Sequence, residues 1–296
     1  MVIGAWNAVA DSIARATGEP FRVDQAKPLG GGCINQGFHL RGGGREFFVK
    51  LNASSALHMF EAEAAGLQEI AATRTVRVPL PICAEADSVQ AWLVLEYLPL
   101  SSSGPHASAA LGERLAAMHR TTQERFGWTR DNTIGSTPQI NAQLSDWGVF
   151  WGQHRFGYQL DLAARNGHRA ALEHSGAQLL ERLPKLFAGY RPAASLLHGD
   201  LWGGNAAATS GGEPVLFDPA VYYGDREVDL AMTTLFGGFA SDFYRAYHDA
   251  WPLDPGHRER RDLYNLYHVL NHLNLFGGGY LRQAQEMMDR LLRELR

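Results

Sequence analysis

The eight residues 198–205, HGDLWGGN, constrain this chain more than any other stretch. A short apolar strand, residues 195–197, leads into them, and residues 206–217 are predicted to form a hairpin with its turn at Gly211-Gly212. An aspartate, Asp218, follows the second strand of that hairpin directly. The polar loop therefore directly precedes the predicted hairpin, and Asp218 directly follows it.

The residue types in this loop and their spacing are typical of phosphoryl transfer. In the pattern H-x-D-x-x-x-x-N, the aspartate accepts or orients the proton of the attacking hydroxyl. The asparagine and a later aspartate supply hard oxygen ligands to Mg²⁺ that bridges the nucleotide phosphates. Asp200, Asn205 and Asp218 have these types and this spacing. The alternative is a surface loop whose Asp and Asn only cap turns, but the second aspartate after an apolar strand argues against it.

A lone cation, Lys50, interrupts the apolar strand of residues 47–51. If this ammonium is buried it needs an anionic partner, a phosphate or a carboxylate; otherwise it is an edge-strand lysine that discourages aggregation. On the helix expected over residues 56–72, Glu63 lies near the apolar stripe and Glu61 points to the side. We expect a Lys50–Glu63 pair of the kind kinases use, with Glu61 as the second choice. Two ordinary surface charges are the remaining alternative.

Three consecutive glycines, residues 30–32, form a turn between two strands upstream of Lys50. They fit neither a Walker loop nor a dinucleotide fingerprint, because they precede a strand rather than a helix. A glycine-rich strand–turn–strand does match the cover that kinases place over the ATP phosphates. Gly31, Gly32 and the side chain of Asn35 are therefore assigned to nucleotide binding, against the alternative of a bare hairpin.

The pattern divides into a β-rich first third and a helix-rich remainder, which predicts an α+β fold. Residues 1–98 are expected to form a nucleotide-binding lobe with a small antiparallel sheet, and residues 99–296 a helical catalytic and acceptor-binding lobe. The stretch 99–105, rich in Ser and Gly, is the predicted linker. The expected helices cover residues 6–17, 56–72, 109–120, 144–164 and 171–183, with two more at the C-terminus. The other expected strands lie within residues 21–40 and at 46–51, 78–83 and 91–96.

Composition excludes several classes of protein. The 296 residues are 45% hydrophobic and 20% charged, which is ordinary globular composition. Lys and Arg number 27 against 31 Asp and Glu, so nothing suggests a nucleic acid or an anionic membrane as partner. No stretch approaches the roughly 18–20 apolar residues of a membrane span, and the N-terminus lacks the basic region of a signal peptide. Two cysteines fit a reducing compartment, so we expect a cytoplasmic enzyme.

Together these residues resemble the protein-kinase-like superfamily, in the branch that holds aminoglycoside phosphotransferases and choline kinases. Within that branch the chain resembles the fructosamine kinase, or ketosamine 3-kinase, family over essentially its whole length. The His-Gly-Asp loop is shared across the superfamily. The segments TPQ at residues 137–139 and YYGDREVD at residues 222–229 distinguish this family from the rest of the superfamily far better.

The resemblance implies a bilobal kinase-like fold and ATP-dependent phosphorylation of O3 of ketosamines, the sugar adducts that glycation forms on amines. The resulting 3-phosphates decompose and free the amine, so the implied role is deglycation. By position, Asp200 would be the base, Asn205 and Asp218 would hold Mg²⁺, and Lys50 with Glu63 would grip the phosphates.

The same resemblance also implies which residues bind the adenine of ATP and which face the sugar of the acceptor. Backbone groups from Glu96 to Leu98 would bind adenine, and Trp202 with His272 would face the sugar. Asp218 is followed by Pro-Ala rather than Phe-Gly, and no A-P-E segment ends an activation loop. A small or flexible acceptor, either a small-molecule ketosamine or a glycated lysine on a protein, is therefore expected.

Two further interpretations concern regulation by oxidation and the structural support of the catalytic loop. Cys33 lies among backbone amides suited to phosphate, so its oxidation would block ATP binding or link two chains into a redox-dependent dimer of an otherwise monomeric protein. The alternative is a small residue that fills space. Asp229, in the charged cluster 225–229, is interpreted as a helix cap or a strut beneath the catalytic loop.

Two rival functions remain. One keeps the mechanism but changes the acceptor to an aminoglycoside, choline or another amino-alcohol, and the Thr-Pro-Gln segment argues against it. The other is a catalytically inactive nucleotide-binding scaffold, which is disfavoured because every expected catalytic position is filled.

Overall fold

The computed structural model describes residues 6–30, 34–101 and 104–295, and the chain divides into two compact units. The first unit contains residues 1–107 and 204–219, and the second contains residues 108–203 and 220–296. The hairpin 204–219 groups with the first unit because β11 (Ala206–Thr209) pairs with β6 (Leu100–Ser101) and the Leu216 N–H donates to the Arg77 carbonyl at 2.9 Å. The predicted 99–105 linker therefore contains a strand. The assignment of nucleotide binding to residues 1–98, and of catalysis and acceptor binding to residues 99–296, stays a prediction.

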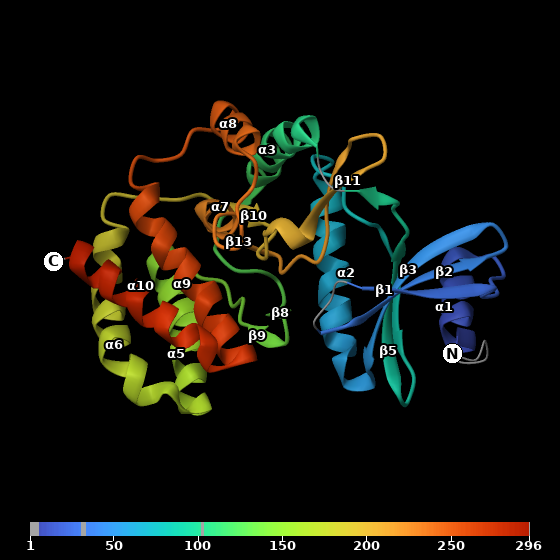
Figure 1. The fold of residues 1–296 in the computed structure, drawn as a ribbon, viewed down its shortest axis with the longest axis horizontal. Helices are drawn as coiled ribbons and strands as arrows, with labels where there is room; N and C mark the ends of the chain where they lie inside the picture. Colours follow the sequence, from blue (N-terminus) through green and yellow to red (C-terminus); the bar gives the residue numbers. More distant parts are fainter. Residues whose placement is uncertain (1–5, 31–33, 102–103, 296) are drawn as a thin grey trace. The chain divides into compact units, whose positions relative to one another are not determined.

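The first unit is built on a five-stranded antiparallel sheet in the order β1-β2-β3-β5-β4 (Figure 1). The β2–β3 turn contains Gly43 and Gly44 at φ +57° and +78°, a backbone conformation that favours glycine. The strands are β1 (Gln25–Leu29), β2 (Gln36–Gly42), β3 (Arg45–Ala53), β4 (Pro81–Ala86) and β5 (Gln90–Glu96).

Two helices cover this sheet, because strand residues alternate between its faces. Val49 and Leu51 of β3 belong to the buried cluster that also contains Ile13 of α1 (Asn7–Thr17). Lys50 therefore points to the other face, where α2 (Leu57–Ala72) packs against β4 and β5. This alternation directs the lysine towards a helix that carries carboxylates.

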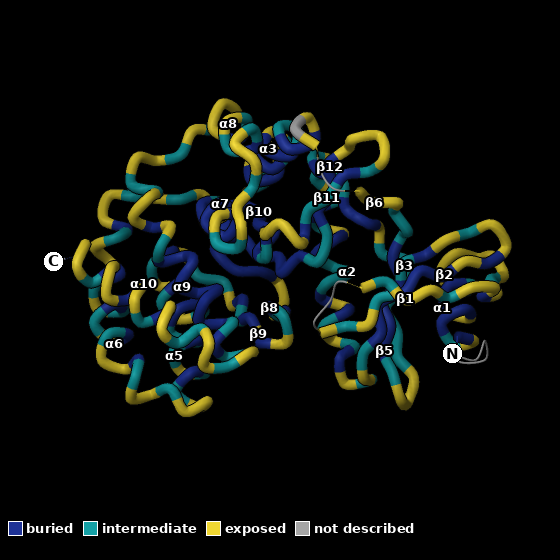
Figure 2. The backbone as a smooth tube through the Cα atoms, in the orientation of Figure 1, coloured by how far each residue is buried: buried dark blue, intermediate teal, exposed yellow. Residues whose placement is uncertain are grey.

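The second unit is mostly helical, and its central helix α9 (His257–Phe276) is largely buried (Figure 2). Between Asp146 and His168 the chain is not one regular helix, because two wider helical turns, Gly152–Gly157 and Ala164–His168, interrupt it. The other helices are α3 (Pro105–His119), α4 (Trp147–Trp151), α5 (Tyr158–Ala163), α6 (Arg169–Leu186), α7 (Glu227–Met232), α8 (Ser241–Ala250) and α10 (Leu281–Glu294).

The second unit contains more β structure than its sequence indicates. A small sheet has the order β13-β10-β7, and β8 pairs with β9. These strands are only two to four residues long, too short for an alternating pattern to reveal. They are β7 (Thr122–Gln123), β8 (Asn132–Ile134), β9 (Thr137–Gln139), β10 (Ala194–Leu197) and β13 (Tyr222–Gly224); the first unit adds β12 (Pro214–Leu216). Three helices, α8 to α10, follow residue 240 where two were predicted.

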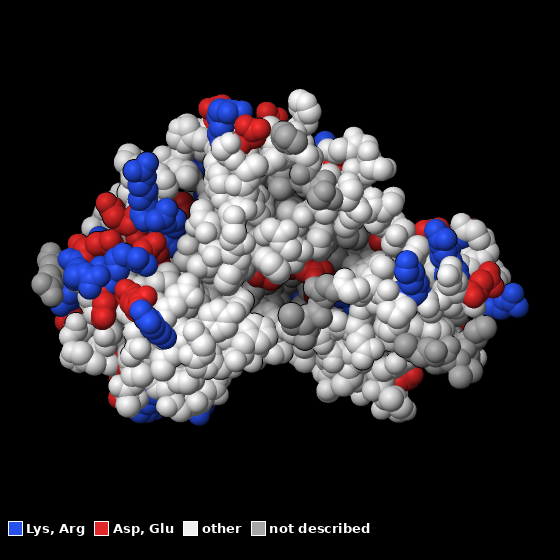
Figure 3. Space-filling view, viewed as in Figure 1, with Lys and Arg blue, Asp and Glu red and all other residues white. Residues whose placement is uncertain are grey.

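The surface of the second unit carries charges of both signs. Over the C-terminal helices, acidic and basic side chains lie next to one another in the view of Figure 3. Arg282 pairs with Glu286 there at 2.7 Å, and Arg290 with Asp262 at 2.7 Å. Among the described residues, no helix has the length and apolar character needed to cross a membrane.

Candidate active site

Lys50 is the centre of a buried charge cluster in the first unit. Its Nζ donates to Oε1 of Glu63 at 2.5 Å and to Oδ1 of Asp218 at 2.6 Å, and the lysine is 5% exposed. The carboxylate partner on α2 is therefore Glu63, whereas Glu61 is exposed on the same helix. The interpretation of Lys50 as an exposed edge residue is excluded.

The two carboxylates keep the lysine charged. Burial by itself would lower the pKa of Lys50, but attraction to Asp218 and Glu63 outweighs it and raises that pKa above its ordinary value. Burial raises the pKa of Glu63, and the Lys50 ammonium opposes that effect. The result is a desolvated cation between two acids, which favours the binding of anionic phosphate oxygens once one acid turns to another ligand.

Asp218 adopts a strained backbone conformation. Its φ is +57°, in the left-handed region that side chains other than glycine avoid at a cost of roughly 1–2 kcal/mol. The Phe217 N–H donates to the Asn205 carbonyl at 3.1 Å, and the Asn205 side-chain amide donates to the Asp218 carbonyl at 3.5 Å. The two oxygen-bearing residues predicted to bind metal are thus neighbours in the first unit. Their side-chain oxygens suit a hard cation such as Mg²⁺.

The loop that carries Asp200 belongs to the second unit and is fixed by its backbone. Gly199 has φ +81°, and a Cβ there would lie 2.1 Å from the Ala220 carbonyl oxygen, so only glycine fits. The Ala220 N–H in turn donates to the His198 carbonyl at 2.8 Å. The loop is thereby tied to residue 220, where the chain re-enters the second unit.

The side chain of Asp229, on α7, also binds the backbone of this loop. Its two carboxylate oxygens accept hydrogen bonds from the N–H groups of His198 at 2.7 Å and Gly199 at 2.8 Å. The expectation that Asp229 is a strut beneath the loop is confirmed. Asp200 itself is half-buried, and its N–H donates to Nδ1 of His198 at 3.3 Å.

An aromatic cluster joins Trp202 to His272, the two residues assigned to the sugar. The ring of Phe236 lies between them, with centroids 6.3 Å from Trp202 and 4.8 Å from His272. On the other side of His272 lie the rings of Phe276 at 5.5 Å and Tyr280 at 5.2 Å. Trp202 is 39% exposed and Phe276 54% exposed, so the cluster presents apolar surface to solvent. Sequence reasoning missed Phe236, Phe276 and Tyr280, although Phe276 follows His272 by one helical turn.

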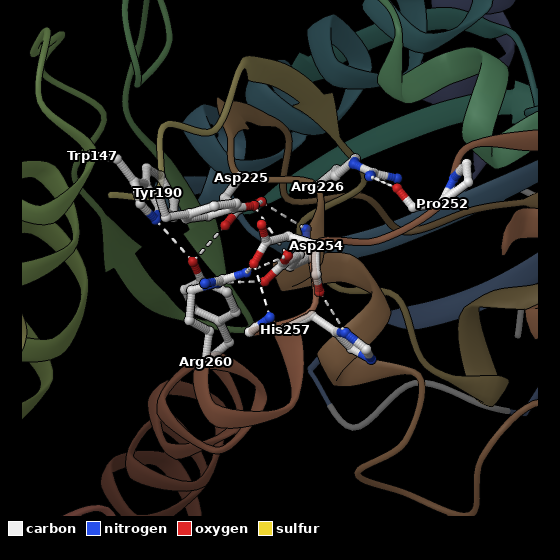
Figure 4. Close-up of polar contacts among 11 residues, drawn as sticks. Trp147, Tyr190, Asp225, Arg226, Pro252, Asp254, His257 and Arg260 are labelled. Carbon is white, nitrogen blue, oxygen red and sulfur yellow. Dashed lines mark hydrogen bonds and ion pairs between the residues drawn. The ribbon is translucent and has the colours of Figure 1, made fainter. Parts of the chain in front are cut away.

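The YYGDREVD segment contributes Asp225 and Glu227 to a buried polar network (Figure 4). Asp225 accepts hydrogen bonds from the hydroxyls of Tyr264 at 2.6 Å and Tyr190 at 3.0 Å. Arg260 donates to both carboxylate oxygens of Glu227 at 2.8 and 2.9 Å. Burial and the nearby Glu227 charge raise the pKa of Asp225 to about 7.

The TPQ segment secures the stretch that follows Asp218. The side-chain amide of Gln139 donates to the Ala220 carbonyl at 3.1 Å, and that of Asn132 donates to the Val221 carbonyl at 2.7 Å. The Tyr267 hydroxyl donates to Gln139 Oε1 at 2.8 Å, which ties the pair to α9. These hydrogen bonds give Gln139 of the TPQ segment, one of the two discriminating segments, a structural role.

The remaining nucleotide-assigned residues lie in the first unit. The Glu96 carboxylate accepts from Arg77 and from the Leu80 N–H at 3.2 Å, and Leu98 is half-buried. Asn35 Oδ1 accepts from the Asn52 side chain at 2.7 Å, which orients it. Gly31, Gly32 and Cys33 lie outside the described residues.

Comparisons with known proteins show the family of the chain. The family model described as fructosamine kinase matches residues 5–294. The chain belongs to the fructosamine kinase family. It is 48% identical over 97% of both chains to a probable ketoamine kinase of Synechocystis. It is 43% identical to a chloroplastic protein-ribulosamine 3-kinase of Arabidopsis thaliana, over 94% of this chain and 86% of that one.

Solved structures show the fold of this fructosamine kinase family member. A putative fructosamine-3-kinase of Haemophilus somnus matches with a TM-score of 0.90 at 27% identity, over 97% of both chains. An aminoglycoside phosphotransferase matches with a TM-score of 0.63 at 16% identity, over 97% of this chain and 98% of that one. The fold is therefore the predicted bilobal, protein-kinase-like α+β fold, and the protein is an ATP-dependent phosphotransferase.

Proposed function

We propose that this kinase transfers the γ-phosphoryl group of ATP to the O3 hydroxyl of a ketosamine, a fructosamine or a ribulosamine. The unstable 3-phosphate then decomposes and frees the amine. The observation that carries the proposal is the buried Lys50 ammonium held between Glu63 and Asp218. The names of its relatives, ketoamine kinase and protein-ribulosamine 3-kinase, support this class of acceptor over an aminoglycoside or choline.

In this proposal the first unit binds ATP. The Lys50 ammonium binds the phosphates, and Glu63 keeps that ammonium in place. Backbone groups from Glu96 to Leu98 bind adenine. The glycines 31 and 32, with the Asn35 side chain, cover the phosphates.

Asn205 and Asp218 would hold Mg²⁺. Among the described residues no three His, Cys, Asp or Glu side chains gather as a metal cage. That fits a cation bound by one carboxylate, one amide and substrate phosphates rather than by protein alone. When bound, Mg²⁺ neutralises the charge that develops on the phosphate oxygens.

Asp200 in the second unit would act as the general base. It accepts the proton of the O3 hydroxyl as the bond from O3 to the γ-phosphorus forms. The bond from that phosphorus to the β–γ bridging oxygen breaks, and ADP leaves. The cluster of Trp202, Phe236 and His272 would receive the acceptor, whose protonated amine is attracted to aromatic faces.

Turnover of ATP over a panel of acceptors tests the proposal. The panel contains fructose-lysine, ribulose-lysine, choline, an aminoglycoside and no acceptor, each with wild type and Asp200→Asn. We expect turnover confined to the two ketosamines and lost in the variant, with phosphorus NMR locating the product phosphate on O3. Turnover on choline or the aminoglycoside alone overturns the assignment of a ketosamine as acceptor. Full activity of Asp200→Asn overturns the assignment of Asp200 as the general base.

Location and assembly stay predictions. Cell fractionation checks the cytoplasmic location, which rests on cysteine usage. The plant relative is named chloroplastic. Size-exclusion chromatography of wild type and Cys33→Ser, with and without peroxide, checks whether a monomer becomes a redox-dependent dimer. Activity on a glycated protein beside fructose-lysine decides between the two acceptor types.

A further inference from the structure

A chain of buried hydrogen bonds runs behind the catalytic loop and beyond Asp229. Nε2 of His119, the last residue of α3, lies 3.1 Å from Oδ2 of Asp229. Nδ1 of the same ring lies 2.8 Å from the hydroxyl of Tyr247 on α8. His119, Asp229 and Tyr247 are each at most 1% exposed. Water therefore does not substitute for any link, and each polar atom depends on its protein partner.

Only one placement of protons satisfies these contacts. Burial alone would raise the pKa of Asp229, but hydrogen bonds from His119 and Gly199 hold that pKa below its ordinary value, so the carboxylate only accepts. Burial lowers the pKa of His119, so the ring is neutral and carries one proton. That proton must sit on Nε2, facing Asp229. Nδ1 then has a lone pair and must accept from the Tyr247 hydroxyl.

Arg226 fixes the direction of the last link. Its Nη1 donates to the Tyr247 oxygen at 3.1 Å, which turns the hydroxyl proton towards His119. The same nitrogen donates to the Trp251 carbonyl at 2.8 Å, and the guanidinium lies 3.9 Å from the centroid of the Trp251 ring. The chain of donors thus runs from Arg226 through Tyr247 and His119 to Asp229, the acceptor for two loop amides.

We propose that Tyr247 and Arg226 are positioning residues that hold the catalytic loop by fixing the orientation of the His119 ring, whose Nε2–H donates to Asp229. Without the Tyr247 hydroxyl, the buried Nδ1 lone pair has no donor, and the ring is free to turn towards another donor. That turn moves Nε2–H away from the ionised Asp229, which loses a donor and holds the loop less firmly. The consequence for turnover rests on the proposed function, in which Asp200, next in the chain to Gly199, is the base.

Kinetics of Tyr247→Phe test the proposal. We expect kcat on the ketosamine to fall about 10-fold, within the range typical for residues that orient a functional group, with the KM for ATP within twofold of wild type. Tyr244→Phe is the matched control on the same helix, because the Tyr244 hydroxyl donates to the Thr233 carbonyl at 3.3 Å and has no part in the chain. Its kcat should be unchanged.

Two variants of His119 separate positioning from packing. His119→Gln keeps an amide N–H at the reach of Nε2 and should retain most of the kcat. His119→Asn is too short to donate to Asp229 and should lose activity like Tyr247→Phe. Thermal unfolding checks that each variant is folded. Equal kcat for all of these variants and wild type overturns the proposal.

A second readout does not depend on catalysis. Long-range ¹⁵N–¹H correlation spectra of histidine-labelled protein, assigned by the loss of one signal in His119→Gln, report which ring nitrogen carries the proton. We expect Nε2–H in both proteins, with the Nε2 proton signal moved upfield in Tyr247→Phe because its hydrogen bond to Asp229 is weakened. An Nε2 proton signal at the same position in both proteins overturns the role of Tyr247. A protonated Nδ1 in wild type overturns the hydrogen-bond chain even if the kinase activity is confirmed. If every acceptor is inert, the proposed function fails while this spectrum still decides the tautomer.

Discussion

Lys50 and Asp218 lie 168 residues apart in the sequence and are joined by a hydrogen bond of 2.6 Å. The lysine side chain is almost fully buried, whereas the Asp218 side chain is 45% exposed. Asp218 can therefore accept a further ligand from solvent while Glu63 continues to hold the lysine. This asymmetry suits a residue that binds a lysine in the absence of nucleotide and a metal ion in its presence.

Asp218→Asn should separate these two roles. The amide keeps the size of the side chain but loses its charge, so we expect kcat to fall roughly 100-fold or more and the Mg²⁺ concentration for half-maximal activity to rise. Steady-state rates across a Mg²⁺ titration provide the measurement. An unchanged Mg²⁺ requirement would contradict the assignment of Asp218 as a ligand.

Two glutamates on one helix offer a matched comparison. Glu63→Gln removes the charge that holds Lys50, so we expect the KM for ATP to rise about 10-fold. Glu61→Gln makes the same chemical change on an exposed position of α2 and should leave KM and kcat at wild-type values. ATP titrations at saturating ketosamine measure both. Equal effects of the two changes would show that the buried pair does not serve nucleotide binding.

The Lys50–Glu63 pair was predictable because two periodicities agree. Strand alternation turns Lys50 away from Val49 and Leu51, and helical periodicity puts Glu63 on the packed side of α2. The loop 198–205 and Asp218 were recognisable because their residue types and spacing reflect chemistry rather than packing. The α+β organisation followed from the change in hydrophobic period along the chain.

Other features had no local signal. The left-handed backbone of Asp218 follows the end of a strand. Asp adopts this conformation more often than most residues, but no neighbouring residue of the sequence predicts it at this position. The contact of His119 with Tyr247 joins residues 128 apart. The pairing of β11 with β6 joins two distant segments and takes the hairpin into the first unit. Such long-range contacts depend on the whole fold, which no window of sequence contains.

The aromatic cluster should control the acceptor and not the nucleotide. Phe236→Ala removes the ring between Trp202 and His272, so we expect the KM for fructose-lysine to rise about 10-fold or more, while the KM for ATP stays constant. Trp202→Ala should act in the same direction, and Trp202→Phe should restore part of the loss. Initial rates with each substrate varied in turn distinguish the outcomes. A change confined to the KM for ATP would remove the cluster from the acceptor site.

Gly199 should tolerate no side chain, for two reasons that can be separated. Gly199→Ala introduces a strained positive φ and a Cβ that would lie 2.1 Å from the Ala220 carbonyl oxygen. Gly189→Ala introduces a similar strain at φ +75° with no atom within 4 Å, and should cost about 1–2 kcal/mol of unfolding free energy with kcat unchanged. Gly199→Ala should cost more and lower kcat, because the loop must move. Urea unfolding and kcat at one temperature measure both; equal behaviour of the two variants would contradict the clash.

Asp225 should make the stability of this protein depend on pH in an unusual direction. Burial and the Glu227 charge raise its pKa from an ordinary 3.8 to about 7 in the folded state. Between these values the folded chain binds more protons than the unfolded chain at this site, so its contribution to stability is complete below about pH 4. That contribution is lost progressively as the pH rises from about 4 to the folded pKa of about 7, and none of it remains above that pH.

Asp225→Asn provides the comparison, because the amide mimics the protonated acid at every pH. The free energy of unfolding of wild type, measured with urea from pH 5 to 8.5, should fall more steeply with increasing pH than that of the variant. The difference in slope between the two proteins should be present from pH 5 to about 7 and should vanish above about pH 8, where Asp225 is ionised in both the folded and the unfolded state. Parallel curves would mean that Asp225 stays ionised in the folded protein, with the hydroxyls of Tyr190 and Tyr264 stabilising its charge.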